Sequence, residues 1–257
     1  MLATAGSGHS GGALGMADIF TALYSTELQF RPTQPHWPDR DRLVLSNGHI
    51  CPVLYVTLAH AGYFPTTELA TLRKINSRLQ GHPSRVDLPG VENSSGPLAQ
   101  GLSQAIGMAL AAQLNQKRYR VYCMMSDGEH DEGQTWEAIL YAGHLAKSQP
   151  LSNLVAIVDR NRIQIDGYTE DVLPLEPFAQ KYQAFNWHVI EIDGHNFHEI
   201  LSAFAAAKKI KDKPVVIIAK TIPGKGVSFM ENKPEWHGKP PTKEEAEKAL
   251  AELKAEL

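Results

Sequence analysis

The sequence predicts an α/β protein with three layers, in which helices cover both faces of a mostly parallel sheet. Short runs of consecutive apolar residues are typical of strands that are buried on both faces of such a sheet. Segments with helical periodicity separate these runs, so strands and helices alternate along the chain. The chain has 257 residues, of which 43% are hydrophobic, and this length allows one large core. We therefore expect a single domain over residues 1–257.

The individual elements follow from local patterns. Five apolar runs are predicted as strands: Leu43–Leu45, Val121–Met125, Leu154–Val158, His188–Ile192 and Val215–Ala219. Four periodic segments are predicted as helices: Ala17–Leu28, Pro97–Leu114, Thr135–Leu145 and Phe197–Lys209. The tail 242–257 begins with a helix-capping Thr and is rich in Lys, Glu and Ala, which predicts a solvated helix or the start of a linker. Arg31–Asp41 and Lys74–Ser95 follow neither pattern and are predicted as loops, which in compact domains are often functional when they are long.

The composition argues against several classes of function. The net charge is −3, and Lys and Arg form no stripe that could follow a phosphate backbone, so we expect no nucleic-acid partner. No apolar run approaches the roughly 20 residues that cross a bilayer, and the N-terminus lacks the features of a signal peptide. We expect a cytoplasmic protein without membrane contact, in which Cys51 and Cys123 are buried, reduced thiols.

The strongest local motif is an acid that follows a predicted strand. Asp127 and Gly128 come after the run that ends in Ser126, and a second predicted strand ends shortly before Asn161. Carboxyl ends of parallel strands share one edge of a sheet, so these side chains are expected to meet there. A carboxylate and an amide oxygen suit Mg²⁺ or Ca²⁺ and leave positions open for phosphate oxygens. From this segment alone, a helix-capping Asp127 and a turn-forming Asn161 are equally good interpretations.

The spacing of these residues resembles the signature of thiamine diphosphate-binding proteins. In that signature an Asp-Gly follows one strand, and a later strand ends in Asp-x-Asn with Ile two residues further on, as in this chain. The signature normally begins Gly-Asp-Gly, and Ser126 stands at its first position. The resemblance implies that Asp127, Asn161 and the Ile163 carbonyl hold Mg²⁺, for which Ca²⁺ can substitute. It also implies that Gly128 and Asn161 contact the cofactor.

Seven segments resemble transketolases and occur in the order of that family. They are Gly8-His9, Leu45-Ser-Asn-Gly-His49, Gly81-His82-Pro83, Leu88-Pro-Gly-Val91, Gly96-Pro-Leu-Ala-Gln-Gly101, Glu132-Gly-Gln-Thr-Trp136-Glu-Ala138 and Ile163-Gln-Ile-Asp-Gly167. The similarity extends from Ala5 to about Gly238. It covers the family's first domain, which binds the cofactor's diphosphate, and it implies the thiamine diphosphate-binding fold. The family has a helix before this region, so we expect natural residues to precede Met1.

Four histidines lie in Gly-rich or Pro-flanked segments: His9, His49, His82 and His237. Each alone is more often a structural hydrogen-bonding group than a catalytic one. The resemblance places His49 near the diphosphate and His82 at the C1 hydroxyl of a ketose donor. It places His9 and His237 around the reacting hydroxyl and carbonyl, where imidazole can act as a base or a donor near neutral pH. We expect structural roles for the other histidines, and the role of His130 stays open.

Two further segments have a structural and a functional interpretation. Glu132 begins a predicted helix, where a carboxylate is favourable in itself. In dimeric thiamine enzymes the matching acid belongs to a buried carboxylate network between active sites, which implies a catalytic role and a perturbed pKa. Gly96–Gly101 is compatible with a simple turn before a helix, but in the family its backbone contacts the cofactor around Gly96 and Leu98. The family often has Gly at the position of Ala99.

The resemblance implies the N-terminal subunit of a split transketolase. Such an enzyme transfers a two-carbon ketol unit from a ketose phosphate to an aldose phosphate, as in the pentose phosphate pathway, and thiamine diphosphate stabilises the carbanion. Because no pyrimidine-binding domain fits beside the matched segments, we expect a C-terminal partner subunit that carries it, in an α₂β₂ assembly. A split transketolase for a modified sugar is an alternative. A non-catalytic thiamine diphosphate-binding subunit is another, which His82 and Glu132 disfavour, and Ser46–His49 disfavours a deoxyxylulose phosphate synthase.

Overall fold

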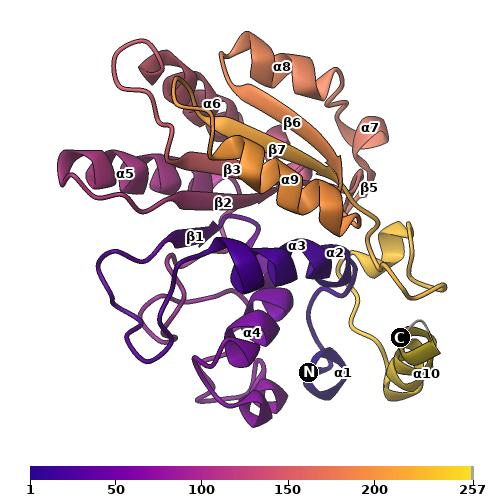
Figure 1. Ribbon diagram of the computed structural model, residues 1–257. Helices are drawn as coiled ribbons and strands as arrows, with labels where there is room; N and C mark the ends of the chain where they lie inside the picture. Colours follow the sequence, from indigo (N-terminus) through magenta and orange to yellow (C-terminus); the bar gives the residue numbers. More distant parts are fainter. Residues whose placement is uncertain (256–257) are drawn as a thin grey trace.

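A five-stranded parallel sheet forms the middle of the computed structural model, which describes residues 1–255 (Figure 1). The strands lie in the order β1-β2-β3-β7-β6, and every neighbouring pair is parallel. Their bounds are β1 Arg42–Leu45, β2 Val121–Ser126, β3 Leu154–Arg160, β6 His188–Asp193 and β7 Val215–Lys220. All five predicted strands are confirmed. Their carboxyl ends lie at one edge of the sheet, where the loops that follow them meet.

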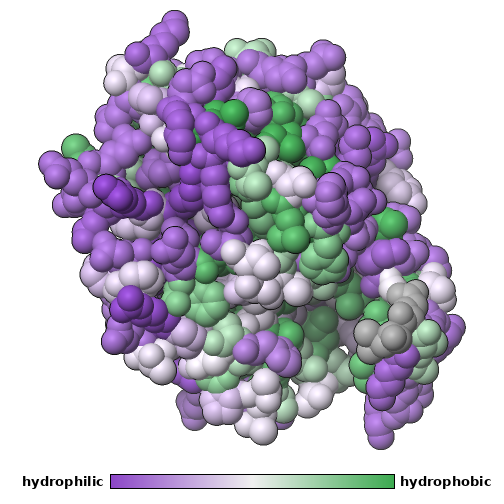
Figure 2. All heavy atoms as spheres, in the orientation of Figure 1, coloured by the Kyte–Doolittle hydropathy of each residue, from purple (hydrophilic) through white to green (hydrophobic). Residues whose placement is uncertain are grey.

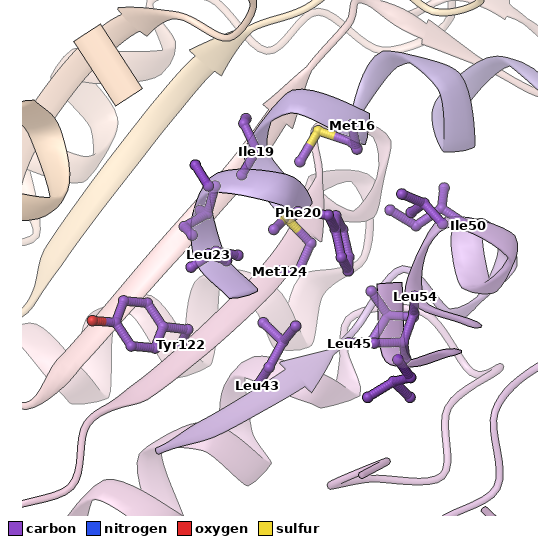
Figure 3. Packing of buried hydrophobic residues seen from close by; sticks show 14 of the residues in the cluster. Met16, Ile19, Phe20, Leu23, Leu43, Leu45, Ile50, Leu54, Tyr122 and Met124 are labelled. Carbon is purple, nitrogen blue, oxygen red and sulfur yellow. The ribbon is translucent and has the colours of Figure 1, made fainter. Parts of the chain in front are cut away.

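Two layers of helices cover the sheet, so the predicted three-layer α/β/α architecture is confirmed. One face carries α3 (Ala17–Ala22), α4 (Cys51–His60) and α9 (Phe197–Ala207), and the other carries α5 (Gln100–Leu114), α6 (Gly133–Leu145) and α8 (Phe178–Ala184). Side chains of a strand alternate between the two faces. In β2, Tyr122 and Met124 pack in the first core, whereas Cys123 and Met125 pack in the second. Figure 3 shows the first core, in which side chains of α3 lie against β1, β2 and α4.

The helices differ from the predicted ones in several respects. The helix predicted over Ala17–Leu28 is α3 followed by a π-helical turn, Leu23–Glu27. The helix predicted from Pro97 begins only at Gln100, because Ala99 has a left-handed backbone with a φ of 66° that cannot continue a right-handed helix. Helices α4 and α8 were not predicted. In α4, buried apolar residues occupy most of the surface and leave no amphipathic period to detect.

Short elements complete the chain and shape the loops at the carboxyl edge of the sheet. They are α1 Leu2–Ala5, α2 Gly11–Gly15, α7 Thr169–Val172, the antiparallel pair β4 Ile163–Gln164 and β5 Gly167–Tyr168, and the 3₁₀ turns η2 Gly48–Ile50, η3 Thr66–Thr71, η4 Gly128–Asp131 and η5 Pro234–Trp236. The predicted loops 31–41 and 74–95 consist of turns and bends. Their backbone hydrogen bonds are those of isolated turns, such as Gln34 N–H to the Arg31 carbonyl, and side-chain pairs such as Arg40–Glu92 add to them.

The predicted C-terminal helix is present as α10, Lys243–Ala255, and residues 256–257 of that prediction lie outside the described residues. Thr242 caps the helix as expected. The Glu245 backbone N–H donates to Thr242 Oγ1 at 3.1 Å, and the Thr242 backbone N–H donates to Glu245 Oε2 at 2.8 Å, which is a reciprocal capping box. Helix α10 lies beside α1, so the two ends of the described chain are close together (Figure 1).

The surface seen in Figure 2 is hydrophilic at its margins, and hydrophobic residues gather in the middle, over α3 and α9. Phe197 and Leu201 of α9 are both exposed. Among residues 1–255, no helix has the length and apolar character needed to span a bilayer. Cys51 and Cys123 are buried and unbridged, as predicted. Burial raises the pKa of Cys51 to about 12, so this thiol stays protonated at neutral pH.

Candidate cofactor and active site

The candidate site lies at the carboxyl edge of the sheet, where loops from neighbouring strands converge. Strand β1 leads into the segment Ser46–His49, β2 leads into Asp127, and β3 leads into Asn161. The parallel register of β2 and β3 pairs Ser126 with Asp159. Strand β2 ends at Ser126 and β3 ends one residue after Asp159, and this brings Asp127 to the turn that contains Asn161.

Asp127 is fully buried, and three N–H groups point at its carboxylate. The Gly128 backbone N–H donates to Oδ1 at 2.8 Å, while the Arg162 backbone N–H and Arg160 Nη1 donate to Oδ2 at 2.7 and 3.0 Å. Burial raises the pKa of Asp127 to about 6, although the Arg160 charge and these hydrogen bonds oppose the rise. Because Oδ2 accepts two donors and Oδ1 accepts one, Oδ1 keeps acceptor capacity for a cation.

Asn161 is held by hydrogen bonds on both sides of its amide. Its Oδ1 accepts the Ile163 backbone N–H at 2.9 Å, and its Nδ2 donates to Asp159 Oδ2 at 2.9 Å. Asp159 is buried and also accepts the Thr221 hydroxyl. Burial raises the pKa of Asp159 to about 7. These contacts fix which way the amide of Asn161 faces, with its oxygen on the side of the Ile163 turn.

The three predicted metal ligands are brought together by this loop. Asp127 and Asn161 form the cap and the turn that their local sequence alone predicted. Asp127 Oδ1 and Asn161 Oδ1 each accept one donor and keep an unused lone pair. The bond from Arg162 to Asp127 ties the turn that contains Ile163 to the carboxylate. No three His, Cys, Asp or Glu side chains within residues 1–255 are grouped so as to hold a metal ion. A carboxylate, an amide oxygen and a carbonyl form instead the mixed oxygen set that suits Mg²⁺ together with phosphate oxygens.

Three of the four predicted histidines form one cluster. The ring centres of His9 and His49 are 5.1 Å apart, those of His49 and His237 are 5.3 Å apart, and those of His9 and His237 are 5.8 Å apart. Burial lowers the pKa of all three imidazoles, to about 4 for His9, and the neighbouring histidines lower those of His9 and His49 further. Each is therefore neutral near pH 7 and can accept a proton or donate an N–H.

His82 lies at the margin of this cluster and is exposed. A Cβ added to Gly96, which has a φ of 148°, would lie 3.6 Å from His82 Cγ, so the ring of His82 lies against this glycine. Burial and the positive charge of Arg73 lower the pKa of His82. The charges of His82 and Arg73 also help to lower the pKa of His9. The four histidines thus share one electrostatic environment, although His82 belongs to a loop of its own.

Several buried polar atoms at this edge have no hydrogen-bond partner in the described part of the chain. They include Nδ1 of His9, both amide atoms of Asn47, and Oγ of Ser95. Ser95 lies close to the Asn47 segment, because a Cβ added to Gly48 would lie 2.6 Å from Ser95 Oγ. Unpaired buried polar atoms are unfavourable in a folded protein, which indicates that this region is built for a polar ligand. Donors such as Asn47 Nδ2 and Ser95 Oγ fit the phosphate oxygens of a diphosphate cofactor.

Asn47 and Ser95 were not predicted as functional residues. The signal that could have found them is their position, because each immediately precedes a Gly in a segment that resembles the family. The predicted residue Leu98 is 37% exposed, so its side chain is available for contact. Glu132 is exposed at the N-cap of α6, without a side-chain capping bond. The isolated chain therefore does not bury Glu132, and its predicted carboxylate network remains a prediction about an assembly.

His130 supports the metal loop from within the core. The buried ring donates through Nδ1 to the backbone carbonyls of Ser126 and Asp127, and its Nε2 accepts the Tyr182 hydroxyl at 2.7 Å. Burial lowers the pKa of His130 to about 4. Both ring nitrogens are thus occupied by protein partners, which gives His130 a structural role.

Arg160 is a buried cation beside Asp127 that the sequence did not single out. It pairs with Asp127 at 3.0 Å, Glu170 at 2.6 Å and Glu176 at 2.8 Å, and its guanidinium lies 5.3 Å from the ring centre of Phe178. These contacts connect the metal loop with the segment around α7. Arg160 stands at the unspecified position of the Asp-x-Asn pattern. A motif that specifies only the Asp and the Asn therefore could not identify it.

Comparisons with known proteins cover nearly the whole chain. The family described as "Transketolase, thiamine diphosphate binding domain" matches residues 1–256. The chain is 45% identical over 251 residues to the 6-deoxy-6-sulfo-D-fructose transketolase subunit SqwG of Clostridium sp. (strain MSTE9), and the match covers 98% of this chain and 90% of the relative. It is 41% identical over 247 residues to an apulose-4-phosphate transketolase subunit of Phocaeicola vulgatus, and that match covers 96% of this chain and 86% of the relative.

A solved structure gives the same result for the fold. The transketolase from Leishmania mexicana superposes with a TM-score of 0.91 and 37% sequence identity, and the match covers 98% of this chain and 38% of that protein. The chain thus spans less than half of a full-length transketolase but most of the two relatives that are named as subunits. From the family match, the identities and the shared fold, we conclude that the chain belongs to the transketolase family and is its thiamine diphosphate-binding domain.

Proposed function

We propose that the chain is the N-terminal subunit of a split transketolase that transfers a two-carbon ketol unit from a ketose phosphate to an aldose phosphate. The observation that carries this proposal is the convergence of His9, His49 and His237 at the sheet edge that also holds Asp127 and Asn161. A binding protein would need the oxygen ligands but not a cluster of neutral imidazoles. The subunit names of the two relatives, which are matched over 90% and 86% of their lengths, support a split enzyme.

The proposed cofactors are thiamine diphosphate and Mg²⁺, for which Ca²⁺ can substitute. Asp127, Asn161 and the Ile163 carbonyl are the proposed metal ligands. The proposed cofactor contacts come from loops at the same edge: His49, Gly96, Leu98, Gly128 and Asn161. The unpaired polar atoms of Asn47 and Ser95 support this placement, because a bound diphosphate would supply the partners that the protein does not.

Bound thiamine diphosphate supplies the electron sink that cleavage of a ketose between C2 and C3 requires. The histidines then have to manage protons and orient the sugar. His9 and His237 are neutral and adjacent, so one can take the proton of the C3 hydroxyl while the other donates an N–H to the carbonyl. His82 is the proposed contact of the donor's C1 hydroxyl. Glu132 is proposed to join a carboxylate network at an interface with a second copy.

We propose that the partner is a C-terminal subunit with the pyrimidine-binding domain and that the assembly is α₂β₂. Leu140 and Tyr141 on α6 are 55% and 50% exposed, and they follow Glu132 on the same helix. Exposed large apolar side chains that gather in a patch mark interaction surfaces, which supports an interface at α6. The proposed location is the cytoplasm, and the proposed pathway is the pentose phosphate pathway.

A transketolase for a modified sugar is the second candidate, because the two relatives are named for 6-deoxy-6-sulfo-D-fructose and apulose-4-phosphate. One assay tests both candidates. The chain, reconstituted with its partner subunit, Mg²⁺ and thiamine diphosphate, is given xylulose 5-phosphate, 6-deoxy-6-sulfofructose or apulose 4-phosphate as the donor. The highest kcat/KM identifies the donor class, and a parallel reaction without thiamine diphosphate is the control. Cofactor binding without ketol transfer from any donor would favour the non-catalytic alternative instead.

The two loop histidines are expected to respond differently to mutation. His82→Ala should lower kcat and kcat/KM for the donor together, by about 100-fold or more, because a contact made in the transition state is lost. Its effect on thiamine diphosphate affinity should be small. His49→Ala should mainly weaken cofactor affinity, since its proposed contact is the diphosphate. Steady-state kinetics and cofactor titration of both variants check this division, which fails if the two profiles are the same.

Ile163→Val is expected to be mild. The proposed ligand is the main-chain oxygen of Ile163, and the side chain is buried at 3% exposure, so the change removes one methylene from the core. Such a loss typically lowers the free energy of unfolding by about 0.5–1.5 kcal/mol. Thermal or denaturant unfolding should show this decrease, while titration with thiamine diphosphate and Mg²⁺ should give the wild-type affinity. A large loss of affinity would mean that the side chain itself shapes the site.

A further inference from the structure

Glu129 joins three separate segments at the carboxyl edge of the sheet. The side chain lies in η4 and is fully buried. Its Oε1 accepts the Ser46 hydroxyl at 2.5 Å and the Ala99 backbone N–H at 2.7 Å, and its Oε2 accepts the Ser126 backbone N–H at 2.8 Å. Ser46 follows β1, Ala99 precedes α5, and Ser126 ends β2. One carboxylate thus connects the loops that follow β1 and β2 with the turn before α5.

The contact with Ala99 acts on an unfavourable backbone conformation. Ala99 has a φ of 66° and a ψ of 0°, a left-handed geometry in which a Cβ is disfavoured and which glycine adopts readily. The residue is completely buried, so solvent cannot satisfy its N–H. The Glu129 carboxylate accepts this N–H instead, and hydrogen bonds to a charged acceptor are stronger than neutral ones. The carboxylate therefore stabilises a turn that the alanine by itself would disfavour.

The Ser46 hydroxyl also connects Glu129 to the first turn of helix α5. Ser46 Oγ donates to Glu129 and accepts the Gly101 backbone N–H at 3.1 Å. A Cβ added to Gly101 would lie 2.4 Å from Ser46 Cβ, so the two segments approach each other as closely as a glycine permits. The first turn of α5 and the segment that leads to His49 are consequently held as one unit.

We propose that Glu129 is a positioning residue that sets the Gly96–Ala99 turn and the Ser46–His49 segment for the diphosphate of the cofactor. This inference rests on the proposed function, since it concerns the same site. Glu129 touches neither a proposed metal ligand nor a proposed cofactor contact with its side chain. It acts through Ala99, which adjoins Leu98, and through Ser46, which lies three residues before His49. Ala99 and Glu129 thus act as a pair, in which the carboxylate stabilises the left-handed turn at Ala99.

Glu129→Gln tests the pair while keeping the side-chain volume. An amide cannot offer acceptor oxygens to both backbone N–H groups, so one of them loses its partner. Ala99→Gly is the companion change, because glycine adopts the left-handed turn without help. Glu27→Gln is the matched control: Glu27 is also a buried glutamate, bonded to the Tyr122 hydroxyl and to Lys208, but Tyr122 lies near the amino end of β2, away from the site.

The first measurement uses the isolated chain without ligand. Amide hydrogen exchange in Glu129→Gln should become at least about 10-fold faster at whichever of Ala99 and Ser126 loses its acceptor, since local protection depends on local hydrogen bonds. Both amides in Glu27→Gln should exchange at the wild-type rate. Near-UV circular dichroism establishes that each variant is folded. If Glu129→Gln does not fold, Ser46→Ala takes its place, and the amide that should then lose protection is that of Gly101.

The second measurement is thiamine diphosphate affinity, at saturating Mg²⁺, in the complex with the partner subunit. Glu129→Gln should weaken the affinity by about 10-fold or more, as the loss of supporting contacts around a bound group often does. In a chain that already carries Ala99→Gly, Glu129→Gln should weaken the thiamine diphosphate affinity by no more than about 3-fold, because coupled residues give non-additive effects. Ser46→Ala, if it is needed, should weaken the affinity in the same direction, and Glu27→Gln should leave it unchanged.

The outcomes separate this inference from the proposed function. If the wild-type complex fails to bind thiamine diphosphate, the proposed function and the inference are both wrong. If the wild type binds the cofactor but Glu129→Gln binds it equally well, the inference is wrong and the proposed function is unaffected. Equal losses with and without Ala99→Gly also overturn it, because Glu129 would then not act through the turn. Unchanged exchange at both Ala99 and Ser126 in a folded Glu129→Gln variant has the same meaning.

Discussion

Asp127→Ala is expected to abolish the metal-dependent binding of thiamine diphosphate. Asp127 is the only carboxylate in the proposed ligand set, and its Oδ1 keeps acceptor capacity while Arg160 and Arg162 occupy Oδ2. Loss of a contact that merely supports a metal ligand typically costs 10- to 100-fold in affinity, so loss of the ligand itself should cost at least about 100-fold. Calorimetry of the reconstituted enzyme with and without Mg²⁺ measures the effect.

Two companion variants make this result interpretable. Asp127→Ala also leaves the buried Arg160 with one partner fewer, so part of its effect could come from the fold. Asp127→Asn keeps the volume and one acceptor oxygen but removes the charge, and it should also weaken metal-dependent binding. Asp171→Ala removes an exposed carboxylate from α7 and should leave the affinity unchanged. An unchanged affinity in Asp127→Ala would reject the metal assignment.

The chain alone is expected to show negligible ketol transfer, even with excess thiamine diphosphate and Mg²⁺. Activation of the cofactor requires an acid that pairs with its aminopyrimidine ring, and in this family that acid belongs to the pyrimidine-binding domain. The described acids beside the site are engaged otherwise: Asp127 with Arg160, Glu129 with Ser46 and Ala99, and Asp159 with Asn161. Loss of a general acid–base group typically lowers rates by about 10²–10⁴-fold, and we expect a deficit of at least that size.

A coupled assay for the aldose product, with and without the C-terminal subunit, measures this dependence. Activity should appear on mixing and should saturate at a fixed ratio of the two subunits, which also reports the stoichiometry of the proposed α₂β₂ assembly. The matched control is the partner subunit by itself. Robust turnover by the isolated chain would contradict both the argument from the missing acid and the proposal of a split enzyme.

The sheet could be predicted well from the sequence because its physical signal is strong. Strands that are buried on both faces are apolar on consecutive residues, and all five such runs became strands of the parallel sheet. Helix α4 carries the same kind of composition, since most of its residues are buried, and a helix without a polar face has no period to reveal it. The start of α5 was wrong by three residues because the left-handed backbone of Ala99 is a tertiary feature.

The site could be predicted only where its residues occupy fixed motif positions. Asp127 and Asn161 follow strand ends, and their position at the carboxyl edge follows from the parallel topology. Arg160 stands at the unspecified position of Asp-x-Asn and Glu129 lies outside the motif, and their roles depend on partners that are distant in the sequence, such as Glu176 and Ser46. A buried charge is costly unless it is paired, but the sequence does not reveal which partners will surround it.

Strand β2 constrains how this protein can change over evolutionary time. Its alternate residues belong to opposite cores, and Asp127 follows its last residue directly. Inserting or deleting one residue within Val121–Ser126 would exchange the two sets of side chains between the cores and would turn the Asp127 carboxylate away from its loop. A change in the length of β2 would therefore disturb both the packing of the two cores and the position of Asp127. Differences in length among related chains should therefore accumulate in loops such as 31–41, which lies outside the sheet and carries none of the proposed site residues.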